Sequence, residues 1–310
     1  MLYLILGDIM KKYFLSIIVL ILFLSGCGTD LPRVRWDVLE PVPQEKRETT
    51  ALRVAVSSMT SPRETYFLYQ EMIEELGREL GMPVVFIQKA SYKEVNDLLR
   101  DKQVDIAFIC SYAYVMGKKE FGLELLAVPR INGKNTYQGY IIVRKDGNIN
   151  SFSDLKDKRF AFTDPMSFTG YFYPLALLRQ QHTDPARFFA ETYFMGSHDN
   201  AIKAVAQGLV DGAAVDGLIY EYMAAKDRSI RANTSIINVS PAAGMPPLVA
   251  RPGLDAKLKE RIAEIMLNLH QRQDGQAILR RLQIERFEPG NDQDYEVIRK
   301  LAQQVKNNGY

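Results

Sequence analysis

Cysteine, histidine and an excess of charge of either sign are all scarce in this chain of 310 residues. It holds two cysteines and three histidines, and 39 basic against 37 acidic residues leave a formal net charge of +2. The cysteines and histidines form no group with the spacing of a metal site, so we expect neither a metal nor another cofactor. Without a basic block, nucleic acid is not expected as a partner.

The chain also lacks a long apolar run at its beginning. The apolar stretch Tyr13–Leu24 is too short for a membrane-spanning helix and follows the basic pair Lys11 and Lys12. It ends in Leu24-Ser25-Gly26-Cys27, which is similar to a bacterial lipobox, where the cysteine is lipidated and becomes the new N-terminus. An uncleaved signal anchor is the alternative.

We therefore predict that residues 1–27 are a lipoprotein signal peptide, with Met10 as the true start and residues 1–9 as an upstream artefact. Residues 28–50 contain three prolines and mixed charges without periodicity, and we expect a flexible tether. With Cys27 acylated, Cys110 is the single free thiol and no disulfide can form within the chain. Cys110 ends an apolar strand and is expected to be a buried small hydrophobe.

The body from residue 51 onwards alternates short apolar strands with helices, which predicts an α/β fold with mostly parallel sheets flanked by helices. The chain is expected to leave its first unit, cross to a second, and return. Lobe 1 then comprises residues 51–143 plus 245–310, and lobe 2 comprises residues 144–244. Two crossing segments make a two-stranded hinge, so we predict a clamshell that holds a ligand between its lobes.

Two polar turns in the second unit carry the chemistry. Ser167, Thr169 and Gly170 follow one predicted strand, and Ser197 and His198 follow the next. Unpaired N–H groups and the positive end of the helix dipole make a helix start suitable for an anion, and a glycine lets a ligand approach the backbone. The alternative is that these residues only cap helices, which is the commoner role of Ser and Thr there.

The resemblance to a known family rests on residues spread over most of the body. They are Tyr92 with Val104–Phe108, Asp164-Pro165-x-Ser167-x-Thr169-Gly170, Ser197-His198-Asp199 and Val210–Asp216. With these residues the chain resembles the periplasmic phosphate/phosphite/phosphonate-binding proteins (PhnD-like) of ABC transporters, which have the type II periplasmic binding protein fold. The resemblance implies that Ser167, Thr169 and His198 hold the phosphorus oxyanion and that Tyr92 contacts it.

The chain departs from the family pattern at two places. Phe168 stands where the family often has a hydroxyl residue, so one donor is lost and a bulky apolar wall is expected. The segment Gly244–Pro247 lacks the acidic residues that bind the amine of an aminoalkyl phosphonate, although Asp216 remains as a candidate ligand contact. A small anion, or one with an apolar substituent, is therefore favoured. Further tyrosines are candidate side walls of the site: Tyr66, Tyr112, Tyr114 and Tyr137.

The resemblance implies a monomeric, extracytoplasmic binding lipoprotein that delivers a small anionic ligand to an ABC permease and is not an enzyme. A sensory protein coupled to a membrane receptor, or a binder of another anion such as a sulfonate, remains open. A hydrolase using Ser167, His198 and Asp199 is disfavoured, because adjacent residues are poorly placed for orienting the histidine ring. Ser167 also lacks a Gly-x-Ser-x-Gly elbow.

Overall fold

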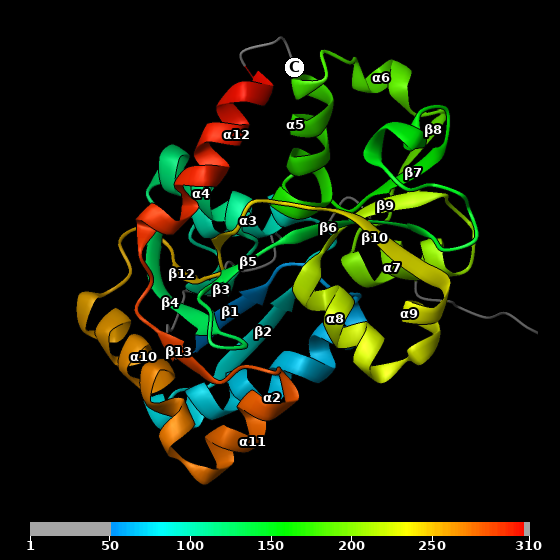
Figure 1. Cartoon of the computed structure of the whole chain (residues 1–310). Coiled ribbons are helices and arrows are strands. Elements are labelled where there is room, and N and C mark those ends of the chain that lie inside the picture. Colours follow the sequence, from blue (N-terminus) through cyan, green and yellow to red (C-terminus); the bar gives the residue numbers. More distant parts are fainter. Residues whose placement is uncertain (1–50, 307–310) are drawn as a thin grey trace, which may run out of the picture. The chain divides into compact units, whose positions relative to one another are not determined.

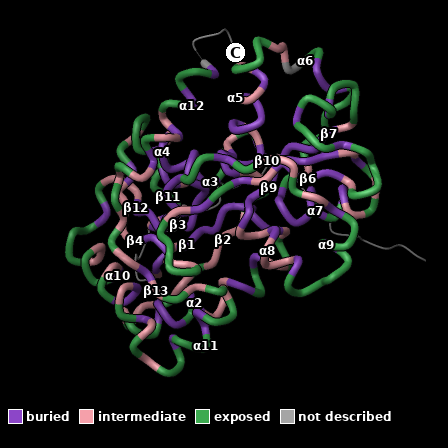
Figure 2. The backbone as a smooth tube through the Cα atoms, in the orientation of Figure 1, coloured by how far each residue is buried: buried purple, intermediate pink, exposed green. Residues whose placement is uncertain are grey.

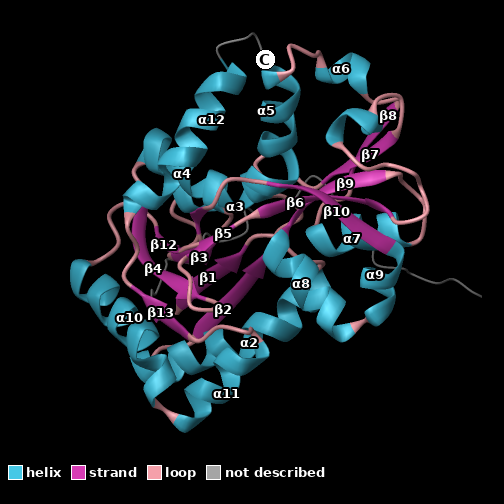
Figure 3. Cartoon of the chain, viewed as in Figure 1, coloured by secondary structure: helices cyan, strands magenta, loops and turns pink. Residues whose placement is uncertain are grey.

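Two β-sheets, each covered by helices, form the part of the chain that the structure describes, residues 51–306 (Figure 1 and Figure 3). The structure is a computed structural model. The predicted signal peptide and tether, residues 1–27 and 28–50, lie outside the described residues, and so does the predicted lipidation site Cys27. Within residues 51–306, no helix is both long enough and apolar enough to cross a membrane.

The first lobe is built on a six-stranded sheet. Its strands are β1 (Leu52–Val56), β2 (Val84–Gln88), β3 (Ile106–Phe108), β4 (Glu124–Arg130), β12 (Leu248–Ala250) and β13 (Arg286–Glu288), and its helices are α2 (Pro62–Leu80), α3 (Tyr92–Arg100), α4 (Ser111–Phe121), α10 (Ala256–Asn268) and α11 (Gln273–Arg281). The strand order is β13-β4-β12-β3-β1-β2. Every residue of β1 except Arg53 is buried, as expected for an apolar run in a covered sheet.

The second lobe is built on a five-stranded sheet. Its strands are β6 (Gly139–Arg144), β7 (Arg159–Phe162), β8 (Glu191–Phe194), β9 (Gly212–Asp216) and β10 (Thr234–Val239), and its helices are α5 (Tyr173–Gln180), α6 (Pro185–Phe188), α7 (His198–Ala206), α8 (Gly217–Lys226) and α9 (Arg228–Asn233). The strand order is β10-β6-β9-β7-β8. A π-helical turn, Phe168–Phe172, runs directly into α5.

A two-stranded antiparallel ribbon joins the lobes. It pairs β5 (Thr136–Tyr137) with β11 (Ala243–Gly244), each on one of the two crossing segments. The Ser111 hydroxyl donates to the Gly244 carbonyl at 2.7 Å, and the Tyr295 hydroxyl donates to the Met245 carbonyl at 2.7 Å. The predicted two-stranded hinge is therefore present, and side chains of the first lobe and the C-terminal segment hold it.

The predicted two-lobed α/β fold is confirmed, but both sheets are mixed rather than mostly parallel. In the first sheet β1 is parallel to β2 and β3, whereas β12 is antiparallel to β3 and β4. In the second, β7 is parallel to β8 and β9, whereas β6 is antiparallel to β9 and β10. Parallel pairing follows from helical crossovers within one lobe. A strand that arrives from the other lobe has no such crossover, and here these strands pair antiparallel.

The crossing segments also differ in detail from the prediction. Strand β6 pairs with β9 and β10, so residues 139–143, which we predicted in lobe 1, belong to the sheet of lobe 2.

The last helix, α12 (Glu296–Lys306), was also predicted in lobe 1, but it contacts both lobes. It packs against α5 and the π-helical turn as well as against α4 (Figure 1). Ile298, Leu301 and Val305 are its buried residues toward this core.

One hydrophobic core runs through both lobes. It includes Tyr112 from α4 and Phe172 from the π-helical turn, whose ring centroids lie 3.7 Å apart, and it extends to Ile298 of α12. Figure 2 shows the buried residues gathered along the strands and the exposed ones on the outer helices. This core places the carboxyl ends of β7, β8 and β9 beside the first lobe.

Candidate functional site

Three turns of the second lobe meet at one edge of its sheet. Because β7, β8 and β9 are parallel, the turns after them lie side by side, and ligands of open α/β sheets bind at such carboxyl edges. The turn after β7 carries Ser167 and Thr169, the turn after β8 carries His198, and β9 ends at Asp216. The structure therefore brings together residues that are up to 49 positions apart in the sequence.

His198 is held as a neutral hydrogen-bond donor. Its ring is buried, and its Nδ1 accepts the backbone N–H of Asp216 at 2.9 Å, with the Thr163 hydroxyl 3.2 Å away. An Nδ1 that accepts leaves the proton on Nε2, which lies 3.5 Å from the Ser167 hydroxyl oxygen. Burial lowers the pKa of His198 to about 3, so the imidazole is uncharged at neutral pH.

The turn after β7 combines a capping hydroxyl with an unpartnered one. The Ser167 hydroxyl accepts the backbone N–H of Gly170 at 3.0 Å and so caps the π-helical turn. The Thr169 hydroxyl is buried and has no hydrogen-bond partner within the described residues. A buried polar atom without a partner costs free energy, and a bound ligand that supplies the missing hydrogen bond removes that cost.

Gly170 has a packing role that the sequence did not indicate. Its N–H is bonded to Ser167 and its carbonyl accepts the N–H of Thr163 at 3.2 Å. A Cβ at this position would collide with the Thr163 side chain. The close approach that requires glycine is therefore to Thr163, whereas we expected an approach to a ligand.

Ser197 occupies the predicted turn, but its proton has another partner. Its hydroxyl donates to Asp199 Oδ1 at 2.7 Å, and the same oxygen accepts the backbone N–H of Ser61 in the first lobe at 2.7 Å. Burial alone would raise the pKa of Asp199, but the bonds from Ser197 and Ser61 and the charge of Lys203 lower it. Asp199 is thus an ionised anchor between the lobes.

Tyr92 reaches the site from the first lobe. It is the first residue of α3, and its backbone N–H donates to Asp164 Oδ2, in the turn after β7, at 3.1 Å. Its side chain is fully buried, and burial raises the pKa of its hydroxyl well above the usual value. The hydroxyl faces Ser167 but makes no hydrogen bond of ordinary geometry within the described residues. The structure thus places Tyr92 beside the turn after β7.

Phe168 and the other predicted wall residues are placed differently. The Phe168 ring is fully buried in the hydrophobic core, with its centroid 6.3 Å from that of Tyr137. Tyr112 and Tyr114 are also core residues, and Tyr66 is exposed and stacks on Phe86. Of these aromatic side chains, only Tyr137 lines the cavity described next.

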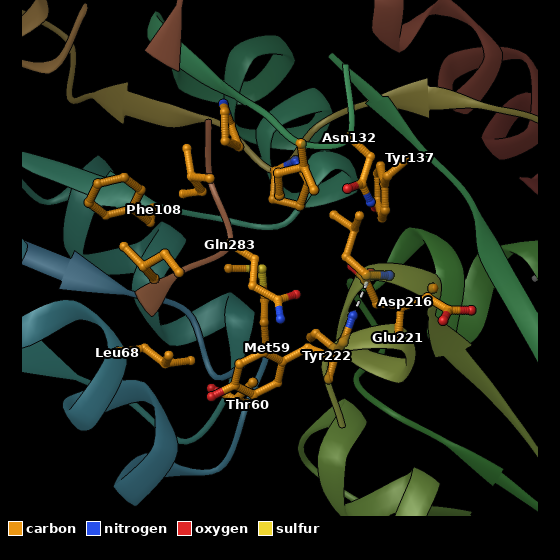
Figure 4. Close-up of a pocket in the computed structure, with 18 of the residues that line it drawn as sticks. Met59, Thr60, Leu68, Phe108, Asn132, Tyr137, Asp216, Glu221, Tyr222 and Gln283 are labelled. Carbon is orange, nitrogen blue, oxygen red and sulfur yellow. Dashed lines mark hydrogen bonds between the residues drawn. The ribbon is translucent and has the colours of Figure 1, made fainter. Parts of the chain in front are cut away.

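Asp216 lies at the border between the three turns and a cavity of about 360 Å³ (Figure 4). Its Oδ1 caps α8 by accepting the N–H of Leu218 at 2.7 Å and of Ile219 at 3.4 Å. Burial raises the pKa of this carboxyl to about 7. Asp216 therefore exchanges its proton near neutral pH, which an exposed aspartate does not do.

The sequence did not indicate the cavity or one of its hydroxyls. Ser57 follows β1, lines the cavity, and has a buried hydroxyl without a partner in the described residues. Since β1, β2 and β3 are parallel, their carboxyl ends share one edge of the first sheet. Applying the sheet-edge rule to the first lobe as well would have pointed to Ser57. No group of His, Cys, Asp and Glu in the described part could hold a metal ion.

Comparisons with known proteins identify the family. A family model for the periplasmic substrate-binding protein of phosphonate ABC transporters matches residues 54–295. The phosphonates-binding periplasmic protein of Escherichia coli is 26% identical over 270 residues, which are 86% of this chain and 79% of that protein. The phosphate-import protein PhnD of Mycolicibacterium smegmatis is 30% identical over 167 residues, which are 50% of this chain and 52%, about half, of that protein's length.

Solved structures give the same fold. A binding-protein component of an ABC phosphonate transporter from Pseudomonas aeruginosa superposes with a TM-score of 0.78 at 22% identity, covering 83% of this chain and 86% of that one. PhnD1 from Prochlorococcus marinus, in complex with methylphosphonate, gives a TM-score of 0.76 at 20% identity and covers 83% and 98%. The type II periplasmic binding protein fold predicted from the sequence is confirmed.

Proposed function

Because the chain belongs to the family of periplasmic substrate-binding proteins of phosphonate ABC transporters, we propose that it binds a phosphorus oxyanion between its lobes and delivers it to a permease. The family consists of extracytoplasmic binding proteins, not enzymes. The observation that carries the proposal is the pair formed by the Nε2–H of His198 and the unpartnered hydroxyl of Thr169 beside Ser167.

The proposed site binds an anion without a cationic side chain. The Nε2–H of His198 and the hydroxyls of Thr169 and Tyr92 are neutral donors in a buried place, where hydrogen bonds to an oxyanion are short and strong. A hydrogen bond to a charged group contributes roughly 1.5–3 kcal/mol to binding, so three such donors contribute roughly 4.5–9 kcal/mol, and the upper end of that range corresponds to micromolar affinity. The Ser167 hydroxyl caps its turn and lies 3.5 Å from His198 Nε2, so we propose it as a further contact to the ligand's oxygens.

The relatives support a phosphorus oxyanion over other anions. One curated relative is a phosphonate-binding protein, the other a phosphate-import protein, and the Prochlorococcus structure holds methylphosphonate. For this chain we propose a phosphonate, phosphite or phosphate as the class of ligand. We propose delivery to an importer rather than to a sensor, because the family model describes transporter components.

We also propose that the chain is a monomer anchored by lipid on Cys27 to a bacterial membrane, with its body outside the cytoplasm. The lipobox Leu24–Cys27 supports this anchoring. Replacing Cys27 by Ser is expected to release the protein from the membrane fraction after cell lysis. Continued sedimentation of the Cys27→Ser protein with membranes would contradict a lipid anchor at this residue.

A thermal-unfolding panel tests the proposed function. The purified protein is melted with phosphate, phosphite, methylphosphonate, sulfate or nitrate at equal ionic strength. A ligand that binds only the folded state adds about 2.7 kcal/mol of stability at a hundredfold excess over its Kd. We expect a melting-temperature increase with phosphorus oxyanions but not with sulfate or nitrate. Equal melting temperatures in every anion would overturn the proposal.

A further inference from the structure

The cavity of about 360 Å³ is separate from the oxyanion turns but adjoins them. Ser167, Thr169 and His198 are not among its lining residues. Three contacts nevertheless connect it to them. The lining residue Asp216 donates its N–H to His198, the carbonyl of Met59 accepts the N–H of His198 at 3.0 Å, and the Tyr137 ring packs on Phe168. Residues of the cavity lining are therefore in direct contact with the turns proposed to hold the phosphoryl group.

The size of the cavity exceeds what a simple oxyanion needs. Pockets that hold organic ligands measure roughly 300–1,000 Å³, and this one falls in that range. Figure 4 shows Asp216 and Tyr137 at one end of it and Phe108 and Leu68 at the other. A phosphate or methylphosphonate bound at the turns would leave this length of cavity to water.

The lining is aromatic and aliphatic with a few neutral polar groups. Tyr69, Tyr140 and Tyr222 contribute rings, and Leu218, Ile219 and Ile284 contribute alkyl groups. Aromatic side chains bury a large area at low cost in conformational entropy. The buried hydroxyls of Ser57 and Tyr137 line the same space without hydrogen-bond partners in the described residues. They are suited to accept or donate one bond each to a ligand.

The charges of the described lining argue against a cationic ligand group. Its two carboxylates are Asp216 and Glu221, and Glu221 is paired with Arg231. Asp216 already caps α8 with one oxygen. The single cation among the described lining residues, Lys134, is exposed. An ammonium group would have to compete with Arg231 for Glu221 or ionise the buried Asp216, whereas an uncharged group would be buried favourably.

We propose that this cavity holds the uncharged organic substituent of a phosphonate or phosphate monoester whose phosphoryl group sits at the Ser167, Thr169 and His198 turns. The inference rests on the proposed function and narrows it. The physiological ligand is then larger than phosphate, phosphite or methylphosphonate. The carbon-linked and oxygen-linked forms share the phosphoryl chemistry and differ in one bridging atom.

Calorimetric titration of the unmodified protein compares methylphosphonate, phenylphosphonate, phenyl phosphate and benzoate. We expect at least tenfold tighter binding of one or both phenyl phosphoryl compounds than of methylphosphonate, and no binding of benzoate. The ratio between phenylphosphonate and phenyl phosphate identifies the preferred linkage. Because this comparison needs no variant, it does not depend on whether a substituted protein folds.

Two variants then locate the substituent. Ile284→Trp fills the cavity from the first lobe and Ile219→Trp fills it from α8, and each is expected to remove the preference for the phenyl compounds. Leu209→Trp is the matched control, since Leu209 is 61% exposed and lies outside the cavity lining. The control should keep the preference at its original ratio.

The outcomes separate this inference from the proposed function. Methylphosphonate binding as tightly as, or more tightly than, both phenyl compounds would overturn the inference and leave the proposed function intact. A phenyl preference that survives in both cavity variants would also overturn it. If no phosphorus compound binds, the proposed function fails and the inference fails with it. Benzoate binding as tightly as phenylphosphonate would show that the phosphoryl turns are not engaged.

Discussion

The turn after β7 and the turn after β8 share a pattern but not a chemistry. Both place a hydroxyl residue before a helical segment at the same edge of one sheet. After β7, the Thr169 hydroxyl is left without a partner in the described residues. After β8, the Ser197 hydroxyl is bonded to Asp199, and the imidazole of His198 is the group aimed at the site. Which polar group remains available thus depends on whether a nearby carboxylate already accepts the hydroxyl hydrogen.

The end of β9 can be compared with these two turns, and replacing its Asp216 is expected to change the free energy of unfolding most. Burial raises the pKa of Asp216 to about 7, so the folded state binds its proton more tightly than the unfolded chain does. The carboxyl therefore destabilises the fold progressively as pH rises from about 4 to 7. Asp216→Asn keeps a capping oxygen and should be more stable than the parent by about 2–4 kcal/mol at pH 8, with no gain at pH 4.

Urea denaturation of Asp216→Asn and the parent between pH 4 and 8 measures this difference. Hydrogen bonds and charge from Arg159 lower the pKa of Asp211, so Asp211→Asn is the control of opposite sign. It should lose stability by a similar amount throughout this range, because the lowered pKa keeps the Asp211 carboxylate ionised from pH 4 to 8. A stability difference for Asp216→Asn that is constant over this range would show that Asp216 does not carry the raised pKa.

The second prediction concerns His198. His198→Ala should weaken phosphorus-oxyanion binding by about 1.5–3 kcal/mol, roughly 10- to 150-fold in Kd, because a donor to a charged group is lost. Because the pKa of His198 is about 3, its contribution should not change between pH 6 and 8. Calorimetry checks both statements, with the exposed His182→Ala as the control. Unchanged affinity in His198→Ala would show that the imidazole does not contact the ligand.

Thr169→Val gives a smaller effect on binding and separates binding from stability. It replaces an unpartnered buried hydroxyl with a methyl group of similar size. The unliganded protein should be as stable as the parent, or about 1 kcal/mol more stable, whereas affinity falls about tenfold. Parallel thermal melts and titrations test this, with Thr169→Ser expected to retain binding. A loss of stability without a loss of affinity would indicate a structural hydroxyl.

Ser197→Ala should have the smallest effect on affinity, and it sharpens the contrast between the two turns. It removes a donor from Asp199, so stability should fall by about 1 kcal/mol. Ligand affinity should stay within about twofold of the parent, because the hydroxyl is directed at Asp199. A tenfold loss of affinity at unchanged stability would show that the Ser197 hydroxyl contacts the ligand, as we propose for the hydroxyl of Thr169.

Much of the arrangement of the candidate site could be predicted because it depends on local sequence. The strand-to-helix junctions predicted the positions of Thr169 and His198, and the order of strands and helices along the chain predicted two lobes. Long-range partners could not be predicted. The bond from Ser61 to Asp199 and the burial of Phe168 against Tyr137 depend on contacts between distant segments. The antiparallel pairing of β12 and β6 likewise depends on which strands each of them meets after crossing from the other lobe.

The double contact of α12 has a mechanical consequence. This helix touches α5 and α4 and also the ribbon strand β11, whereas Glu64 of α2 and Tyr222 of α8 meet well away from it (Figure 1). When two lobes rotate about a hinge axis, atoms near the axis move little and distant atoms move far. With the hinge axis at the ribbon and α12, rotation of the lobes would preserve the apolar packing near the axis. It would break the hydrogen bonds that join the lobes farther away, such as Ser61 to Asp199 and Tyr222 to Glu64, each of roughly 1–3 kcal/mol.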